Sequence, residues 1–213
     1  MNSVREALGR LFHRVEFLYM VLGFAYLGIY AVQVLVEPPA DIFASLELVS
    51  ELIFWVFAVD VVLRLIHAGG DLLTWKGAGS FLKENWLALL ALLLPAFRSL
   101  RVLRVIVVLR GLEPYLKTRS SRVGMIVGVT FPLILFTAAL SVLEAERYAD
   151  GSNIQSFGDA IWWSIASVTT VGYGDKFPVT SDGRVIATFL LVIGIGLFSA
   201  LTALLAAWVM GDR

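Results

Sequence analysis

The sequence predicts an all-α membrane protein with six transmembrane helices, and composition and apolar runs are the observations behind that prediction. Of the 213 residues, 59% are hydrophobic and only 16% are charged. The mean hydropathy of +0.84 is too high for an ordinary soluble domain. A helix crosses a bilayer with about 20 apolar residues. Apolar runs occur at about 15–36, 46–67, 84–97, 98–112, 122–145 and 183–209.

Four of these runs are clearly long enough to span. The third is short, because its apolar core WLALLALLLPAF covers only about 18 Å at 1.5 Å per residue. Pro95 separates it from the fourth run, so we count both. The first run follows a basic segment, as in a signal peptide, but it exceeds the 7–15 apolar residues of a signal core.

Charge and cysteine content exclude several classes of function. Lysine and arginine together number 17, as do aspartate and glutamate, so no nucleic-acid partner is expected. The chain has no cysteine, which excludes disulfides and thiol nucleophiles. His13 and His67 stand alone and no carboxylate pair or nucleophile constellation appears, so we expect neither an enzyme nor a cofactor.

The positions of basic residues predict the orientation in the membrane. Loops rich in lysine and arginine face the cytoplasm, and such loops precede the first run, separate the second from the third, and separate the fourth from the fifth. The loop VEPPADIFASLE has three acidic residues and no basic one. We therefore expect a multi-pass plasma-membrane protein with both termini cytoplasmic, surrounded by membrane lipids, whose segment 146–182 enters from outside.

That segment contains a short apolar run followed by a polar one. FGDAIWWSIASV, residues 157–168, is too short to cross a bilayer and leads directly into TTVGYGD, residues 169–175. Non-helical backbone survives at membrane depth only when it is buried in protein or lines an aqueous cavity. Gly172 and Gly174 allow conformations in which successive carbonyls point the same way. We therefore predict a re-entrant pore helix and loop.

TTVGYGD together with the preceding Trp162 and Trp163 resembles the potassium-channel signature. That resemblance implies a selectivity filter in which backbone carbonyls replace the water shell of a cation, the known mechanism of the TVGYG loop. It also implies a homotetramer, with potassium as the permeant ligand and no other cofactor. The implied filter residues are Thr170, which also offers its hydroxyl, Val171, Gly172, Tyr173 and Gly174.

The resemblance also implies residues that support the filter. Trp162 would bond Asp175 and Trp163 would bond Tyr173, although both indoles would also suit an aromatic belt at the membrane interface. Glu146 resembles a carboxylate that bonds the top of the pore region, with a solvated loop charge as the alternative. Some family members have a glutamate where this chain has Ala166.

The last helix has Gly194 and Gly196 near its middle, where glycine weakens a helix by up to about 1 kcal/mol. Resemblance to prokaryotic channels makes Gly194 the gating hinge. Close helix packing through small residues is the alternative explanation.

The segment FRSLRVLRVIVVLR carries arginines at intervals of three, except where Val107 fills one position. Arginine inside a span marks function, and this pattern resembles the voltage-sensor helix of the family. An amphipathic helix lying on anionic lipid is the alternative. The candidate sensing residues are Arg98, Arg101, Arg104 and Arg110.

Buried arginines need acidic partners, and the second run supplies Glu51 and Asp60, nine residues apart. By resemblance Phe57, Asp60 and Arg64 match the plug, carboxylate and basic residue of a charge-transfer site. The third run departs from the family, since Ala88 stands where an aspartate is usual. A weaker or shifted sensor is therefore expected.

Taken together, these features predict a voltage-gated potassium channel. The expected parts are a cytoplasmic segment (1–14), a four-helix sensor (15–112), a linker (113–121) and a pore domain (122–213). One alternative is a potassium channel with a weak sensor, gated by a ligand or by a further cytoplasmic domain. A secondary transporter is disfavoured, because it would need related repeats in the two halves and none is visible.

Overall fold

The computed structural model describes residues 18, 21–68, 77, 79–83 and 126–211. The described residues up to 83 belong to one compact unit, and those from 126 belong to another. All regular structure in these ranges is helical and contains no strand, as the sequence predicts. The third and fourth apolar runs, with all four candidate sensing arginines and Ala88, lie outside the described residues.

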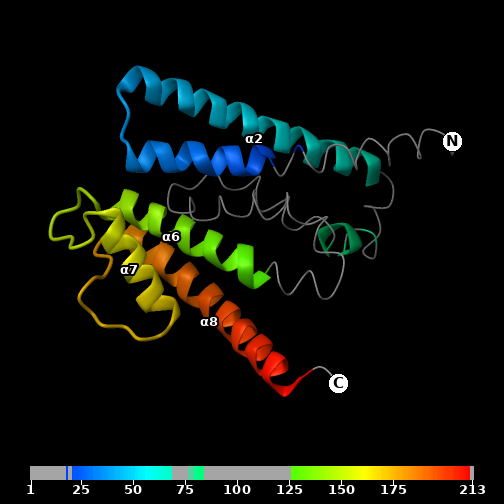
Figure 1. Cartoon of the computed structure of the whole chain (residues 1–213). Coiled ribbons are helices and arrows are strands. Elements are labelled where there is room, and N and C mark those ends of the chain that lie inside the picture. Colours follow the sequence, from blue (N-terminus) through cyan, green and yellow to red (C-terminus); the bar gives the residue numbers. More distant parts are fainter. Residues whose placement is uncertain (1–17, 19–20, 69–76, 78, 84–125, 212–213) are drawn as a thin grey trace. The chain divides into compact units, whose positions relative to one another are not determined.

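Among the described residues of the first unit, two long helices are joined by a short turn (Figure 1). The first spans Val21–Leu35, and α2 spans Ala40–Ala68. Pro38 and Pro39 lack the N–H that a continuing helix would need, so they separate the two helices. Glu37 adopts a positive φ of 49° at the turn. Asp41 lies in the first turn of α2, where a negative charge suits the helix dipole.

Each of these two helices buries one stripe of side chains. Leu27, Tyr30 and Val34 are buried at spacings of three and four, which place them on one helical face. On α2 the buried positions are Ile53, Phe57, Ala58, Asp60 and Val61. A charged residue is thus part of the buried stripe of α2.

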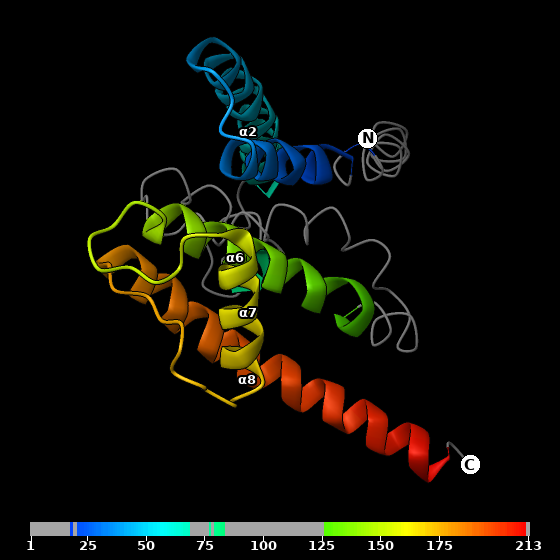
Figure 2. The same ribbon diagram turned by 60° about the vertical axis from the view of Figure 1, so that its left-hand side comes forward.

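Between residues 126 and 211, the second unit has a short π-helix and three α-helices that pack pairwise (Figures 1 and 2). The π-helix η5 covers Ile126–Thr130 and leads into α6, Phe131–Glu146. Next comes α7, Phe157–Val168, whose bounds agree with the predicted pore helix. The loop 169–180 then returns to α8, Ser181–Met210.

Two described helices are long and apolar enough to cross a membrane, Gly128–Glu146 and Ser181–Ala203. Their lengths of 19 and 23 residues correspond to about 29 and 35 Å, against a hydrocarbon core of about 30 Å. They match the fifth and sixth predicted spans. The total of six spans stays a prediction.

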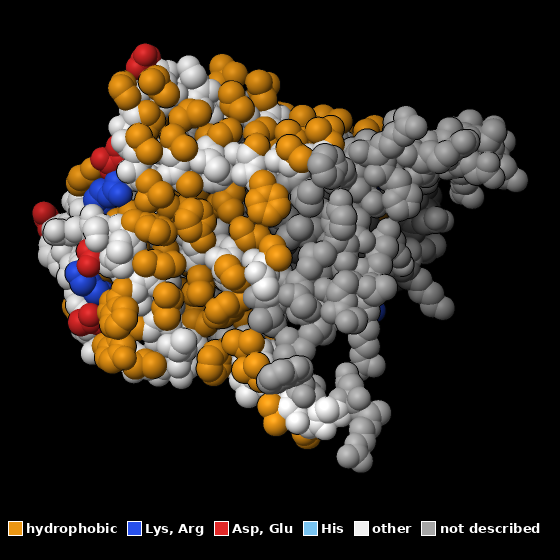
Figure 3. Space-filling view, in the orientation of Figure 1, with side chains coloured by type: hydrophobic (Ala, Val, Ile, Leu, Met, Phe, Trp, Pro, Cys, Tyr) orange, Lys and Arg blue, Asp and Glu red, His pale blue; other side chains and the backbone are white. Residues whose placement is uncertain are grey.

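The core of the second unit lies along the C-terminal half of α6, where every residue from 137 to 143 is buried. By contrast, α8 buries Ile186 and Leu190 but leaves Val192 68% and Ile195 60% exposed. In Figure 3 the charged side chains of this unit gather at the end where its loops lie, and hydrophobic side chains cover the helices next to that end. This distribution suits a membrane-embedded unit that presents α8 to lipid or to other chains.

Candidate functional site

The site begins at the N-terminus of α7, which has a complete capping box. The backbone N–H of Asp159 donates to Ser156 Oγ at 3.1 Å, and the N–H of Ser156 donates to Asp159 Oδ2 at 3.1 Å. The reciprocal bonds satisfy amides that a helix start leaves without partners. Lys176, whose Nζ lies 2.7 Å from Asp159 Oδ1, together with Ser156, lowers the pKa of Asp159 from 3.8 to about 2.

At its other end, α7 holds the start of the loop TTVGYGD. The backbone N–H groups of Val171 and Gly172 both donate to the carbonyl of Ala166, at 3.1 and 3.2 Å. Thr170 N–H donates to the carbonyl of Ser167 at 3.1 Å. The first three residues after the cap are therefore folded back onto the last turn of the helix, and their amides have partners.

The backbone of this loop alternates in handedness. Thr170, Gly172 and Gly174 have positive φ values of 61°, 59° and 77°, whereas Val171 and Tyr173 between them have negative φ. An added Cβ at Gly172 or Gly174 would meet nothing within 4 Å. Glycine is therefore required there for its conformation and not for space. Thr170 accepts a conformation that costs a non-glycine residue about 1–2 kcal/mol.

The alternation has a consequence for the carbonyl groups. In an ordinary strand successive carbonyls point to opposite sides, but alternating handedness lets them turn to the same side. Within the described residues, no hydrogen bond is accepted by the carbonyl oxygens of residues 170–173. The loop therefore offers a run of carbonyl oxygens whose lone pairs are available to a cation.

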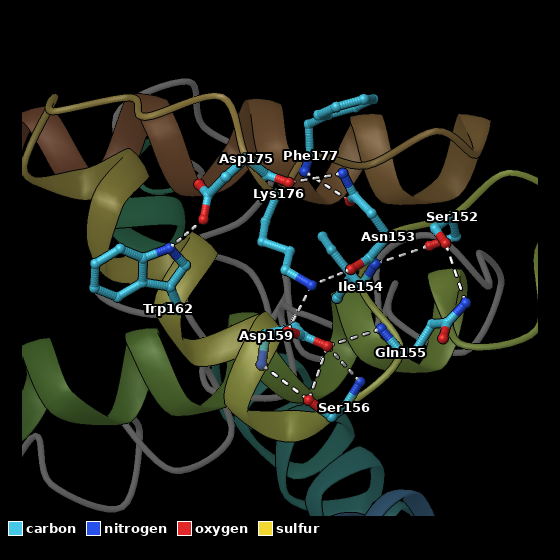
Figure 4. A network of polar contacts seen from close by, with 10 residues as sticks. All are labelled: Ser152, Asn153, Ile154, Gln155, Ser156, Asp159, Trp162, Asp175, Lys176 and Phe177. Atoms are coloured by element: carbon cyan, nitrogen blue, oxygen red, sulfur yellow. Dashed lines mark hydrogen bonds and ion pairs between the residues drawn. The ribbon is translucent and has the colours of Figure 1, made fainter.

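The predicted contact between Trp162 and Asp175 is present in the structure. Trp162 Nε1 donates to Asp175 Oδ2 at 2.9 Å, and the Trp162 ring stacks on Tyr173 with centroids 5.3 Å apart (Figure 4 shows the hydrogen bond). The expected bond from Trp163 to Tyr173 does not occur within this part of the chain. Trp163 is instead buried, with only 6% of its surface exposed, and Trp162 is the partner of Tyr173.

The segment after the loop is held by residues that the sequence analysis missed. Asn153 Nδ2 donates to the carbonyl of Asp175 at 2.9 Å, and Asn153 Oδ1 accepts from the N–H of Phe177 at 3.1 Å. Lys176 Nζ donates to the carbonyl of Asn153 at 2.7 Å (Figure 4). Only the capping pattern Ser156-x-x-Asp159 gave a sequence signal for this network.

Glu146, at the end of α6, is completely buried. Its Oε2 accepts from the N–H of Val179 at 3.0 Å, and its Oε1 accepts from the N–H and Oγ1 of Thr180 at 2.9 and 2.7 Å. Of the two interpretations that the sequence left open, a solvated loop charge is therefore wrong. The carboxylate joins the end of α6 to the start of α8.

Gly194 lies where α8 packs against the end of α7. A Cβ added there would lie 2.9 Å from Val168 Cγ2, whereas one added at Gly196 would meet nothing within 4 Å. Gly194 is thus required for close packing, and α8 continues as one helix through it. A hinge at this position stays a prediction.

The candidate charge-transfer residues are only partly brought together. Phe57 and Asp60 are both 3% exposed, and Arg64 Nε donates to Asp60 Oδ2 at 2.9 Å. Glu51 is exposed, because nine residues make two and a half turns of α-helix and place it opposite Asp60. The two carboxylates therefore do not lie on one face of α2, and only Asp60 belongs to its buried stripe.

Comparison with known proteins shows that the second unit is similar to ion channels. Residues 128–211 match a family model described as ion channel. The chain is 37% identical over 85 residues to the calcium-gated potassium channel TvoK of Thermoplasma volcanium, which covers 40% of this chain and 24% of that protein. Ion channels are not enzymes, in agreement with the lack of a catalytic constellation in the sequence.

Two further relatives have names that describe different kinds of gating. A cyclic nucleotide-gated potassium channel of Rhizobium etli is 37% identical over 38% of this chain and 23% of its own length. A potassium voltage-gated channel, subfamily A member 5, of Rattus norvegicus is 33% identical over 40% of this chain and 15% of its own length. The matched segment is thus less than a quarter of each relative.

Proposed function

We propose that this chain, whose residues 128–211 belong to an ion-channel family, is the subunit of a potassium-selective channel in the plasma membrane. The observation that carries the proposal is the loop 170–173, with alternating backbone handedness and carbonyl oxygens that accept no hydrogen bond among the described residues. A dehydrated potassium ion would exchange its water shell for these oxygens and for the Thr170 hydroxyl.

Four copies of the chain would be needed to surround an ion, because one strand of carbonyls covers only one side of it. Exposed apolar side chains around the loop support this assembly. Trp162 is 46% exposed, Val171 54% and Tyr173 64%. Exposed large apolar side chains gathered at one site are typical of an interaction surface. Neighbouring copies of the same loop would cover them in a homotetramer, with lipid around its outer helices.

We further propose that the first unit makes opening depend on voltage. The support is the arginine series Arg98, Arg101, Arg104 and Arg110 in the sequence, and the buried Asp60 on α2 as a candidate partner. Moving one charge through 100 mV is worth about 2.3 kcal/mol, so one or two effective charges in each of four subunits suffice for gating. Both termini would face the cytoplasm.

A second candidate is a potassium channel that opens on binding a ligand. The relatives named as calcium-gated and cyclic nucleotide-gated favour it, since their sequence identity to the second unit exceeds that of the voltage-gated relative. Under this alternative the arginine-bearing segment would move little, and a further domain or subunit would act on α8.

A planar-bilayer recording of the purified chain tests both candidates. Potassium and sodium are placed on opposite sides, and the voltage is stepped between about −150 and +150 mV. A reversal potential close to that of potassium, with opening that varies with voltage, would support the first candidate. Selective current without voltage dependence would support the second, and equal permeability to sodium would refute the potassium filter.

A further inference from the structure

The pore helix α7 is tied to the segment after the loop at two successive positions. Asp159 and Trp162 are three residues apart and so lie on one helical face. Trp162 bonds Asp175, and Asp159 pairs with Lys176 at 2.7 Å. The ion pair between Asp159 and Lys176 is not part of the resemblance from which the filter was predicted. It belongs to a network centred on Asn153 (Figure 4).

Asn153 holds the backbone on both sides of Lys176 with a single side chain. Its amide nitrogen donates to the carbonyl of Asp175, and its amide oxygen accepts the N–H of Phe177. The side chain therefore acts like a neighbouring strand and determines how residues 175–177 lie. Two hydrogen bonds from one planar amide also fix the orientation of that segment better than one contact would.

Lys176 connects this arrangement to α7. Its ammonium lies 2.7 Å from the carbonyl of Asn153 and 2.7 Å from Asp159 Oδ1. The other carboxylate oxygen of Asp159 accepts from Ser156 N and Ser156 Oγ, at 3.1 and 2.8 Å. Because the capping box fixes the carboxylate on the first turn of α7, the ion pair also fixes Lys176 relative to that helix.

We propose that Asn153, Asp159 and Lys176 form an outer clamp that positions the end of the candidate filter, as positioning residues additional to Trp162. The proposal rests on the proposed potassium channel only for its functional consequence. Bonds to Ala166 hold the start of the loop, and the outer clamp holds the segment that follows it. Loosening the clamp would let the carbonyl run lose its shape while both spanning helices stay intact.

Amide hydrogen exchange on the full chain in detergent tests the clamp without requiring current. Asn153→Ala removes the acceptor of the Phe177 amide, and Lys176→Met removes the ion pair but keeps the capping box. We expect exchange of peptides covering 175–177 to rise on the order of two- to five-fold in each variant, the range expected for a partly exposed pair or hydrogen bond. Asp150→Asn is the control, because Asp150 lies at an exposed loop position before α7 and takes part in none of the clamp contacts.

Bilayer recordings then test the functional consequence. Both clamp variants should shorten the time for which the channel stays conductive at low external potassium, and Lys176→Arg should restore it because it keeps the charge. If Asn153→Ala fails to assemble, Asn153→Asp takes its place in both measurements. That change removes the donor to the carbonyl of Asp175 but retains the acceptor of the Phe177 amide. Unchanged exchange at 175–177 in every clamp variant would overturn the proposal. A parent chain without potassium current would refute the proposed function instead, and the exchange data would still decide on the clamp.

Discussion

Glu146 and Thr180 are joined twice, since both the backbone N–H and the hydroxyl of Thr180 donate to the same carboxylate oxygen. The residues are 34 positions apart, and Glu146 is fully buried. A buried carboxylate in this setting is stable only while its partners remain. The contact therefore fixes the distance between the end of α6 and the start of α8, on which the loop between them depends.

Replacing Glu146 by alanine should strongly destabilise the second unit. The change leaves the amides of Val179 and Thr180 without their acceptor, and an unsatisfied buried group costs about 1–3 kcal/mol. We expect a loss of at least about 2 kcal/mol, measured by thermal unfolding in detergent. Asp150→Asn, at an exposed loop position, serves as control and should change stability little. Equal stability of the Glu146 variant and the parent would contradict the joining role.

Replacing Gly172 by alanine should damage selectivity through backbone conformation alone. Its φ is +59° and an added Cβ has room, so the strain of about 1–2 kcal/mol falls on the loop itself. We expect sodium permeation or loss of current. Gly151→Ala is the matched control, because Gly151 also has positive φ and open space but lies before α7. A potassium-to-sodium reversal potential that stays unchanged in Gly172→Ala would refute the filter assignment.

The two central glycines of α8 should respond differently to alanine. At Gly194 a Cβ would press against Val168, so overpacking should cost about 1–3 kcal/mol. At Gly196 there is space, and alanine should be neutral or stabilise the helix by up to about 1 kcal/mol. Thermal unfolding of both variants is the measurement. If packing is the cause, adding Val168→Ala to Gly194→Ala should recover the lost stability. If Gly194 acts only as a hinge, the second change should recover nothing.

The sequence predicted the elements that local pattern determines. Residues 157–168 appear as α7 with the expected bounds, because a short apolar run that leads directly into a glycine-rich loop leaves few alternatives. The loop conformation followed from Gly172 and Gly174, which supply positive φ. Thr170 adopts the same handedness without being glycine, and no sequence rule indicated it.

Contacts between distant residues were harder to predict. Asn153, Asp159 and Lys176 are ordinary loop or cap residues, and their connection spans more than 20 positions. The opposite faces of Glu51 and Asp60 could have been found by counting turns of α-helix. The partner of Tyr173 could not have been found in this way, since either of the two adjacent tryptophans was chemically suitable.

Acid should weaken the outer clamp only at low pH. The ion pair with Lys176 and the hydroxyl of Ser156 lower the pKa of Asp159 from 3.8 to about 2. A lowered pKa means that the folded state favours the charged form, so this stabilisation is fully present above about pH 4 and is lost as pH falls toward about 2. NMR titration of Asp159 measures it. In Lys176→Met the pKa should rise toward its usual value, and no change there would rule out the ion pair as the main cause.

Neutralising Asp60 should shift the voltage at which the proposed channel opens. Asp60 is 3% exposed and bonded to Arg64, and Asp60→Asn preserves the shape and an acceptor while removing the charge. Because each charge that moves through 100 mV changes the free energy by about 2.3 kcal/mol, loss of a buried partner should displace the midpoint by tens of millivolts. Open probability against voltage is the measurement.

Glu51→Gln removes the same charge from the exposed, opposite face of α2 and should shift the midpoint much less. Equal shifts in the two variants would indicate a general surface-charge effect, and no shift in either would argue that Asp60 plays no part in sensing.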